Sequence, residues 1–163
     1  DSAHTSWSAL PPSPPPGSPR LPRLARLYAI VDVELCAAAA RAPIDVVRAF
    51  CDAWGTPDQI DAALAHLADD CVYHNIPLEA VNGIEDIRAT VLGFTAGVDK
   101  VEFETLAIAA DGNQVLTERI DTFFFPGKPV ALPVMGTFEV NADGRITAWR
   151  DYFDLNQFMS QMG

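Results

Sequence analysis

The hydrophobic pattern of this chain changes period along its length. Apolar residues recur at helical spacing in three segments, residues 43–54, 56–67 and 84–94. They alternate with polar residues in four later segments, residues 101–109, 115–125, 130–140 and 146–153. Helices followed by strands that are joined by short turns indicate an α+β fold. A further short strand is predicted over residues 70–76, so we expect a strongly curved sheet whose concave face is covered by three to four helices, forming a cone with a pocket inside.

The first part of the chain differs in composition from the rest. Seven of the thirteen prolines precede residue 41, and such a Pro/Ser-rich stretch buries too little surface to offset its ordering entropy. We therefore expect residues 1–41 to be a leader that is poorly ordered or foreign to the natural protein. Residues 42–163 are expected to form one domain of ordinary size.

Charge and cysteine usage limit the possible partners and the compartment. The net charge of −11 is unfavourable for binding nucleic acid or anionic membranes. Three cysteines are an odd number with no metal-like spacing, which fits a reducing cytoplasm. No apolar run approaches the roughly 18 residues of a membrane-spanning helix. We expect a cytoplasmic protein that binds no nucleic acid and inserts into no membrane.

One predicted strand carries a guanidinium and a carboxylate on the same face. Arg119 and Asp121 alternate with Ile120, so both charged side chains point the same way. Apolar residues occur on both faces of this strand, which predicts that both faces are covered. Buried charges are costly unless they are paired, and they concentrate at functional sites. Taken alone, such an Arg-x-Asp pair is more often a structural ion pair.

Two other predicted strands place polar groups among aromatic neighbours. Tyr73 and Asn75 share one face of the first strand, and Trp149, Asp151 and Phe153 share one face of the last. If these faces converge with that of the central strand, one pocket holds two carboxylates, a guanidinium, a phenol and a carboxamide. One carboxylate would then take a proton from water while the other, still protonated, gives its proton to a leaving oxygen.

Other reaction classes lack their sequence signals. The chain contains no Gly-x-Ser-x-Gly, no Gly-rich phosphate loop and no Cys/His nucleophile spacing. His4 and His66 add no metal pattern. We therefore expect no metal and no cofactor. Each polar residue named above also has an ordinary structural interpretation, as an edge-strand polar group, a helix cap or a core aromatic.

Taken together, three stretches resemble the limonene-1,2-epoxide hydrolase family. They are residues 70–78 (DCVYHNIPL), 117–121 (TERID) and 146–155 (ITAWRDYFDL), within a similarity that runs from about residue 44 to residue 158. The resemblance implies an NTF2-like (SnoaL-like) cone with a curved mixed sheet, assembled as a homodimer through the sheet. It also implies cofactor-free, one-step hydrolysis of a small hydrophobic epoxide by water.

The resemblance further implies a role for each site residue. Asp151 would be the general base, with Tyr73 and Asn75 holding the attacking water. Asp121 would be the general acid, and Arg119 would bridge the two aspartates. The wall of the pocket would comprise Phe94, Phe123, Leu132, Val134, Trp149 and Phe153.

Two alternatives remain open at the level of sequence. One is a ketosteroid-isomerase-like or polyketide-cyclase-like enzyme of the same fold, which needs one base and an oxyanion donor. The other is a non-catalytic module for ligand binding or dimerisation, because a fold does not determine a function.

Overall fold

The computed structural model describes residues 41–162, so the expectations for residues 1–40 lie outside the described residues. The helical elements are α2 (Pro43–Asp52), the 3-10 turn η1 (Pro57–Gln59), α3 (Ile60–Leu64), α4 (Ile84–Phe94) and α5 (Leu155–Met162). Asp154 caps α5, because its Oδ1 accepts hydrogen bonds from the backbone N–H groups of Asn156 and Gln157. Within residues 41–162, no helix is both long enough and apolar enough to cross a membrane.

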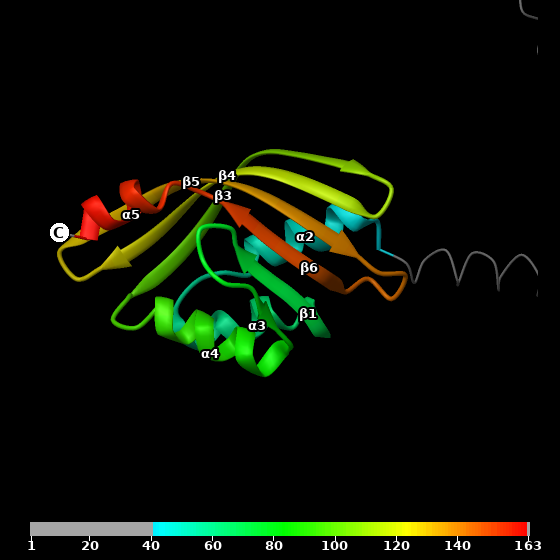
Figure 1. Ribbon diagram of the computed structural model, residues 1–163, viewed down its shortest axis with the longest axis horizontal. Helices are drawn as coiled ribbons and strands as arrows, with labels where there is room; N and C mark the ends of the chain where they lie inside the picture. The colour runs from blue at the N-terminus through cyan, green and yellow to red at the C-terminus, as the bar shows by residue number, and fades with distance from the viewer. Residues whose placement is uncertain (1–40, 163) are drawn as a thin grey trace, which may run out of the picture. The chain divides into compact units, whose positions relative to one another are not determined.

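The strands form one six-stranded mixed sheet (Figure 1). They are β1 (Leu67–Asn75), β2 (Val81–Asn82), β3 (Lys100–Asp111), β4 (Gln114–Phe125), β5 (Lys128–Val140) and β6 (Ile146–Tyr152). The order across the sheet is β2-β1-β6-β5-β4-β3. β3 to β6 are antiparallel neighbours, and β1 pairs with β6 in parallel. This arrangement confirms the predicted α+β class, and the parallel pairing brings the first strand beside the last.

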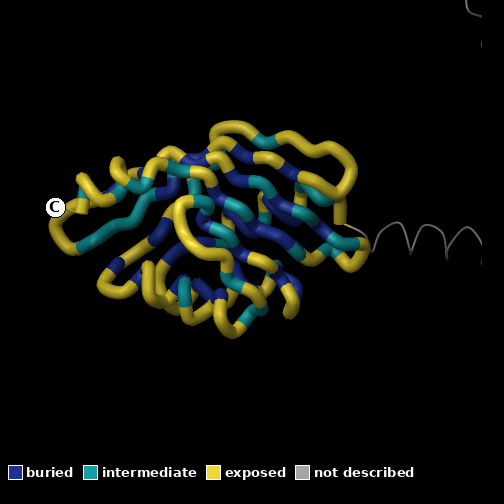
Figure 2. The backbone as a smooth tube through the Cα atoms, viewed as in Figure 1, coloured by how far each residue is buried: buried dark blue, intermediate teal, exposed yellow. Residues whose placement is uncertain are grey.

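The core lies between the inner face of the sheet and the helices. α2 packs against β3, β4 and β5 and buries Val46, Val47, Phe50 and Cys51. The Phe50 ring makes edge contacts with Trp149 and Phe138, at centroid distances of 5.0 and 5.8 Å. Burying a side chain of this size stabilises the fold by roughly 1.5–3 kcal/mol. Figure 2 shows the buried residues running along the central strands.

The outer face of the sheet differs from what the sequence predicted. Leu106, Leu116, Met135 and Tyr152 are between 43% and 53% exposed. Outer-face neighbours across the strands include the pairs Glu118–Met135 and Met135–Tyr152. Within this chain the described residues bury only the inner face, so the cover expected over the outer face is not supplied by residues 41–162. We call Leu106, Leu116, Met135 and Tyr152 the outer patch.

Several element boundaries also differ from the predicted ones. α2 ends at Asp52 instead of continuing to Trp54, and the backbone at Gly55 joins the sheet edge because its carbonyl accepts from the N–H of Val101 at 2.8 Å. The predicted second helix is divided into η1 and α3 and ends at Leu64. β1 begins at Leu67, where pairing with β6 replaces the helical turn. Trp54 lies two residues beyond the end of α2 and is buried in the core.

Candidate active site

Arg119 lies on the inner face of β4 and has no exposed surface. Its Nε and Nη2 donate to Oδ1 and Oδ2 of Asp121, at 3.0 and 2.9 Å. Its Nη1 donates to Oγ1 of Thr117 at 3.0 Å. The rings of Phe103 and Phe138 lie 4.7 and 5.7 Å from its guanidinium carbon. Strand alternation in β4 thus places the guanidinium of Arg119, the carboxylate of Asp121 and the hydroxyl of Thr117 on one face, where aromatic rings exclude water.

Asp151 of β6 completes an ion cluster with Arg119. Nη2 of Arg119 donates to its Oδ1 at 2.9 Å, and Nε1 of Trp149 donates to its Oδ2 at 2.8 Å. Asp151 and Asp121 are each only 4% exposed. The guanidinium therefore bridges two carboxylates that come from residues thirty positions apart, the arrangement that the family resemblance implied. Each Asp151 oxygen accepts one of these bonds and retains acceptor capacity for a further donor such as water.

Gly136 is what allows the bridge to form. It lies on β5, between Thr117 of β4 and Asp151 of β6 in the register of the sheet. A Cβ at this position would stand 2.2 Å from Nη1 of Arg119 and 2.6 Å from Oγ1 of Thr117. The guanidinium reaches the neighbouring carboxylate across the surface of β5, and only a residue without a side chain leaves that path open.

β1 supplies the remaining two predicted polar residues. Its parallel register places Tyr73 beside Trp149 and Asn75 beside Asp151. The rings of Tyr73 and Trp149 stack at 4.0 Å. Both β1 residues are buried, at 6% and 9% exposure. The side chains singled out on three separate strands therefore meet at one place.

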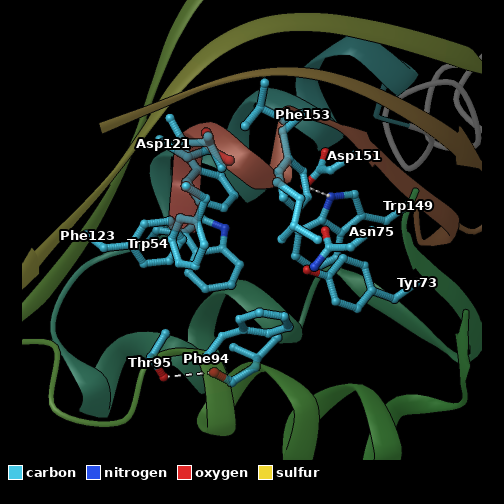
Figure 3. A pocket seen from close by; sticks show the side chains of 16 residues that line it. Trp54, Tyr73, Asn75, Phe94, Thr95, Asp121, Phe123, Trp149, Asp151 and Phe153 are labelled. Carbon is cyan, nitrogen blue, oxygen red and sulfur yellow. Dashed lines mark hydrogen bonds between the residues drawn. The ribbon is translucent and has the colours of Figure 1, made fainter. Parts of the chain in front are cut away.

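These residues form one end of an apolar pocket (Figure 3). All six residues predicted for its wall line it, namely Phe94, Phe123, Leu132, Val134, Trp149 and Phe153. Six further lining residues were not predicted, namely Trp54, Val91, Thr95, Phe103, Leu155 and Phe158. Phe103 lies on β3, and the other five lie on α4 and α5 or just after the ends of α2 and α4. The pocket is thus mostly apolar with a polar cluster at one end, which is typical of a small-molecule binding site.

Burial sets the protonation of the cluster. Removal from water raises the pKa of Asp121 to about 6, an effect that Arg119 opposes and the charge of Asp151 reinforces. Burial likewise raises the pKa of Asp151. Burial alone would lower the pKa of Arg119, but the two carboxylates more than offset this and raise it. One guanidinium between two ionised carboxylates leaves a net charge of −1, which a single added proton cancels. The buried site therefore favours one protonated and one ionised aspartate.

Thr117, Gly136 and Trp54 belong to the site but were missed in the sequence. Thr117 shares the period of Arg119 and Asp121, so the alternation that identified those residues could also have identified it. Gly136 has no local signal, because its function depends on the pairing of three strands. Trp54 was assigned to a helix that ends two residues before it.

Solved structures of low sequence identity share this fold. A protein with a ketosteroid isomerase-like fold from Catenulispora acidiphila is 22% identical, with a TM-score of 0.62 over 71% of this chain and 90% of its own. A putative polyketide cyclase from Xanthomonas campestris is 22% identical, with a TM-score of 0.63 over 74% of this chain and 96% of its own. SnoaL-like and NTF2-like proteins are also among the structural neighbours, so the chain has the NTF2-like fold that the resemblance implied.

Closer relatives identify the family within this fold. Epoxide hydrolase EphG of Mycobacterium tuberculosis is 42% identical over 109 residues, which are 67% of this chain and 71% of that protein. The structure of an M. tuberculosis LEH-like epoxide hydrolase is 36% identical, with a TM-score of 0.62 over 72% of this chain and 86% of its own. The family model of the limonene-1,2-epoxide hydrolase catalytic domain matches residues 41–163. The chain belongs to the limonene-1,2-epoxide hydrolase family.

Proposed function

We propose that this protein is an epoxide hydrolase that opens an epoxide to a vicinal diol in one step, by general acid and base catalysis. The observation that carries the proposal is the Asp121–Arg119–Asp151 cluster, buried at the end of an apolar pocket. The strain of the three-membered ring makes a strong nucleophile unnecessary. The family membership and the epoxide hydrolases among the relatives support the same reaction.

Asp151 acts as the base in this mechanism. Its carboxylate is fixed by Arg119 on one oxygen and by Trp149 on the other, so its orientation is set before the substrate binds. A water molecule held by Asp151, Asn75 and Tyr73 loses a proton to Asp151 as its oxygen bonds to an epoxide carbon. Burial and the nearby charge of Asp151 raise the pKa of Tyr73, so its hydroxyl stays protonated and can donate or accept.

Asp121 acts as the acid. Its pKa of about 6 keeps a useful fraction protonated near neutral pH, and its proton passes to the epoxide oxygen as the carbon–oxygen bond breaks. The reaction leaves the proton on Asp151 and the charge on Asp121. Exchange with solvent water restores the starting state. Arg119 holds the two carboxylates in fixed geometry throughout and needs no change of charge.

The pocket favours a hydrophobic cyclic or lipid-like epoxide. Phe94 and Phe123 line it with large aromatic side chains, which suits such a substrate. The rival reaction types of this fold need only one base, and they leave the second carboxylate and the bridging guanidinium without a function.

We also propose a homodimer that forms through the outer patch, in the cytoplasm. The exposure of Leu106, Leu116, Met135 and Tyr152 supports this assembly, because apolar side chains gathered on an open sheet face favour contact with a partner. The net charge of −11 supports the proposal that nucleic acid is no partner.

The proposal is tested with a panel of epoxides, from cyclic terpenoid to bulky lipid or sterol, scored for diol. Single turnover in heavy-oxygen water follows for each substrate that reacts. We expect label in the diol and none in the protein. Label found first in Asp121 or Asp151 would indicate a covalent ester mechanism instead. If no epoxide is turned over, the isomerase-like, cyclase-like or binding interpretation is favoured.

A further inference from the structure

Trp54 presents a hydrogen-bond donor that no described residue uses. The side chain is 9% exposed, and its Nε1 has no hydrogen-bond partner among residues 41–162. Trp54 lines the pocket, and Figure 3 shows the nitrogen-bearing edge of its ring turned toward the pocket interior. An indole nitrogen can only donate, and a buried donor left unsatisfied is unfavourable. Buried polar groups in native proteins are nearly always partnered.

The orientation of this indole is fixed by its neighbours. Its ring stacks on Phe103 with centroids 4.6 Å apart and planes 27° apart. It meets the edge of Phe50 at 5.8 Å and lies tilted against Trp149 at 5.9 Å. Rings on several sides leave little freedom to turn, so the N–H direction is built into the core. The donor is pre-oriented at no further cost in side-chain entropy when a ligand binds.

The other indole of the pocket provides a contrast. Nε1 of Trp149 is committed to Asp151 at 2.8 Å and serves the reacting end. Asp121 already supplies a proton for the epoxide oxygen in the proposed mechanism, and Asn75 and Tyr73 hold the water. In Figure 3, Trp54 lies on the side of Phe123, across from Asn75 and Tyr73. The N–H group of Trp54 therefore has no role in the proposed reaction at the epoxide ring.

We propose that Trp54 is a specificity-determining residue that donates a hydrogen bond to a second oxygen of the substrate. The preferred substrate class is then a hydrophobic epoxide that also carries a neutral acceptor, such as a carbonyl, ether or hydroxyl oxygen. A neutral acceptor is favoured over a carboxylate because the site already holds two aspartates against one arginine. The inference rests on the proposed epoxide hydrolase activity and narrows its substrate.

The test compares two cyclic epoxides of the same ring size, one with and one without a ketone or methoxy oxygen away from the epoxide. The wild-type protein should have the higher kcat/KM for the oxygenated substrate. Trp54→Phe keeps an aromatic ring against Phe103 but removes the donor. The ratio of the two kcat/KM values should fall roughly tenfold in this variant, as expected for the loss of one neutral hydrogen bond. The change should be mainly in KM, because the bond is made equally in ground and transition states.

Phe94→Leu is the matched control, because it alters the same pocket without removing a polar atom. It should change kcat/KM by the same factor for both substrates, so that the ratio of the two values stays near that of the wild-type protein. A second variant replaces Trp54 with benzothienylalanine, which keeps the bicyclic shape and lacks the N–H. It gives the same measurement if Trp54→Phe folds poorly.

Two outcomes would overturn this inference and leave the proposed function standing. One is a wild-type protein that hydrolyses both epoxides without preferring the oxygenated one. The other is a Trp54 variant that loses activity on both substrates equally, which would mean that the indole acts by shape or at the epoxide ring. Failure of the wild-type protein to hydrolyse either substrate would overturn the proposed function, and this inference with it.

Discussion

Two forked Arg–Asp pairs in this protein have nearly the same geometry and opposite consequences. Nε and Nη2 of Arg119 lie 3.0 and 2.9 Å from the two oxygens of Asp121, and the same atoms of Arg88 lie 2.8 and 3.2 Å from those of Asp61. The hydrogen bond with Arg88 lowers the pKa of Asp61. Burial raises the pKa of Asp121 to about 6 despite its arginine.

The difference lies in access to water. The side chains of Arg88 and Asp61 are 46% and 66% exposed, whereas those of Arg119 and Asp121 are 0% and 6% exposed. At the surface the carboxylate keeps its hydration, and the arginine adds a modest attraction. In the core the lost hydration outweighs that attraction, and a second carboxylate adds repulsion. The same pair is therefore an ordinary ion pair in one place and the basis of an acid in the other.

The largest expected effect comes from neutralising either buried carboxylate. Asp121→Asn removes the proposed acid and Asp151→Asn the proposed base, and each should lower kcat/KM for epoxide hydrolysis by about 10²- to 10⁴-fold. Both variants should keep a native circular dichroism spectrum, because the amide is nearly isosteric. Asp61→Asn is the surface control and should retain wild-type activity. Near-normal turnover by either core variant would remove that residue from the mechanism.

Gly136→Ala should have the next largest effect, because it displaces Arg119 while leaving both aspartates in the chain. The new Cβ would overlap Nη1 of Arg119 and Oγ1 of Thr117, so the guanidinium must shift. We expect kcat/KM to fall by about 10²-fold, the usual result of displacing a catalytic group by about an ångström. The free energy of unfolding should fall by about 1–3 kcal/mol.

Chemical denaturation and steady-state kinetics measure the two effects of Gly136→Ala separately. Gly127→Ala is a glycine control outside the site, where nothing stands within 4 Å of an added Cβ, although its φ of +93° makes the variant strained. It should lose stability with little change in kcat/KM. A fully active Gly136→Ala variant would show that the bridge to Asp151 does not need an unobstructed path across β5.

The residues that local alternation could identify are those whose environment follows from their own strand. Arg119, Asp121 and Asp151 each share a face with apolar or aromatic neighbours, which predicted that they would be buried. The function of Gly136 depends on the register of β4, β5 and β6, which is set by contacts far apart in the sequence. β2 has only two residues, Val81–Asn82, and is too short to show any period.

The outer face of the sheet shows a second property that strand alternation does not predict. Alternation correctly divided β4 into two faces, but it could not say what covers each one. Helices cover the face of Arg119, whereas Leu116 on the other face is 43% exposed among the described residues. An apolar residue in a strand indicates that its face of the sheet is more stable when another protein surface covers it. Whether the contact is made within the chain or with a partner depends on interactions that a single sequence pattern does not contain.

The pH dependence of activity tests the raised pKa of Asp121 directly. Because burial raises it to about 6 from an ordinary value near 3.8, the folded protein binds more protons than the unfolded chain between these values. The contribution of this residue to the free energy of unfolding therefore decreases as pH rises through that window. The proposed acid is lost over the upper part of the same range, so kcat/KM should fall about tenfold per pH unit above about pH 6. A profile that stays flat up to pH 8 would contradict the assignment of Asp121 as the acid.

The smallest expected effect is at the surface pair, where the sign reverses. Arg88→Gln removes the hydrogen bond that lowers the pKa of Asp61, so this pKa should rise toward its ordinary value. Asp61 stabilises the fold above its unfolded pKa and loses that contribution as pH falls, the reverse of Asp121. Carboxyl NMR titration measures the shift, and kcat/KM should stay unchanged. If activity changed as well, the surface pair would be coupled to the pocket, and access to water would not be enough to explain why only one of the two pairs serves the reaction.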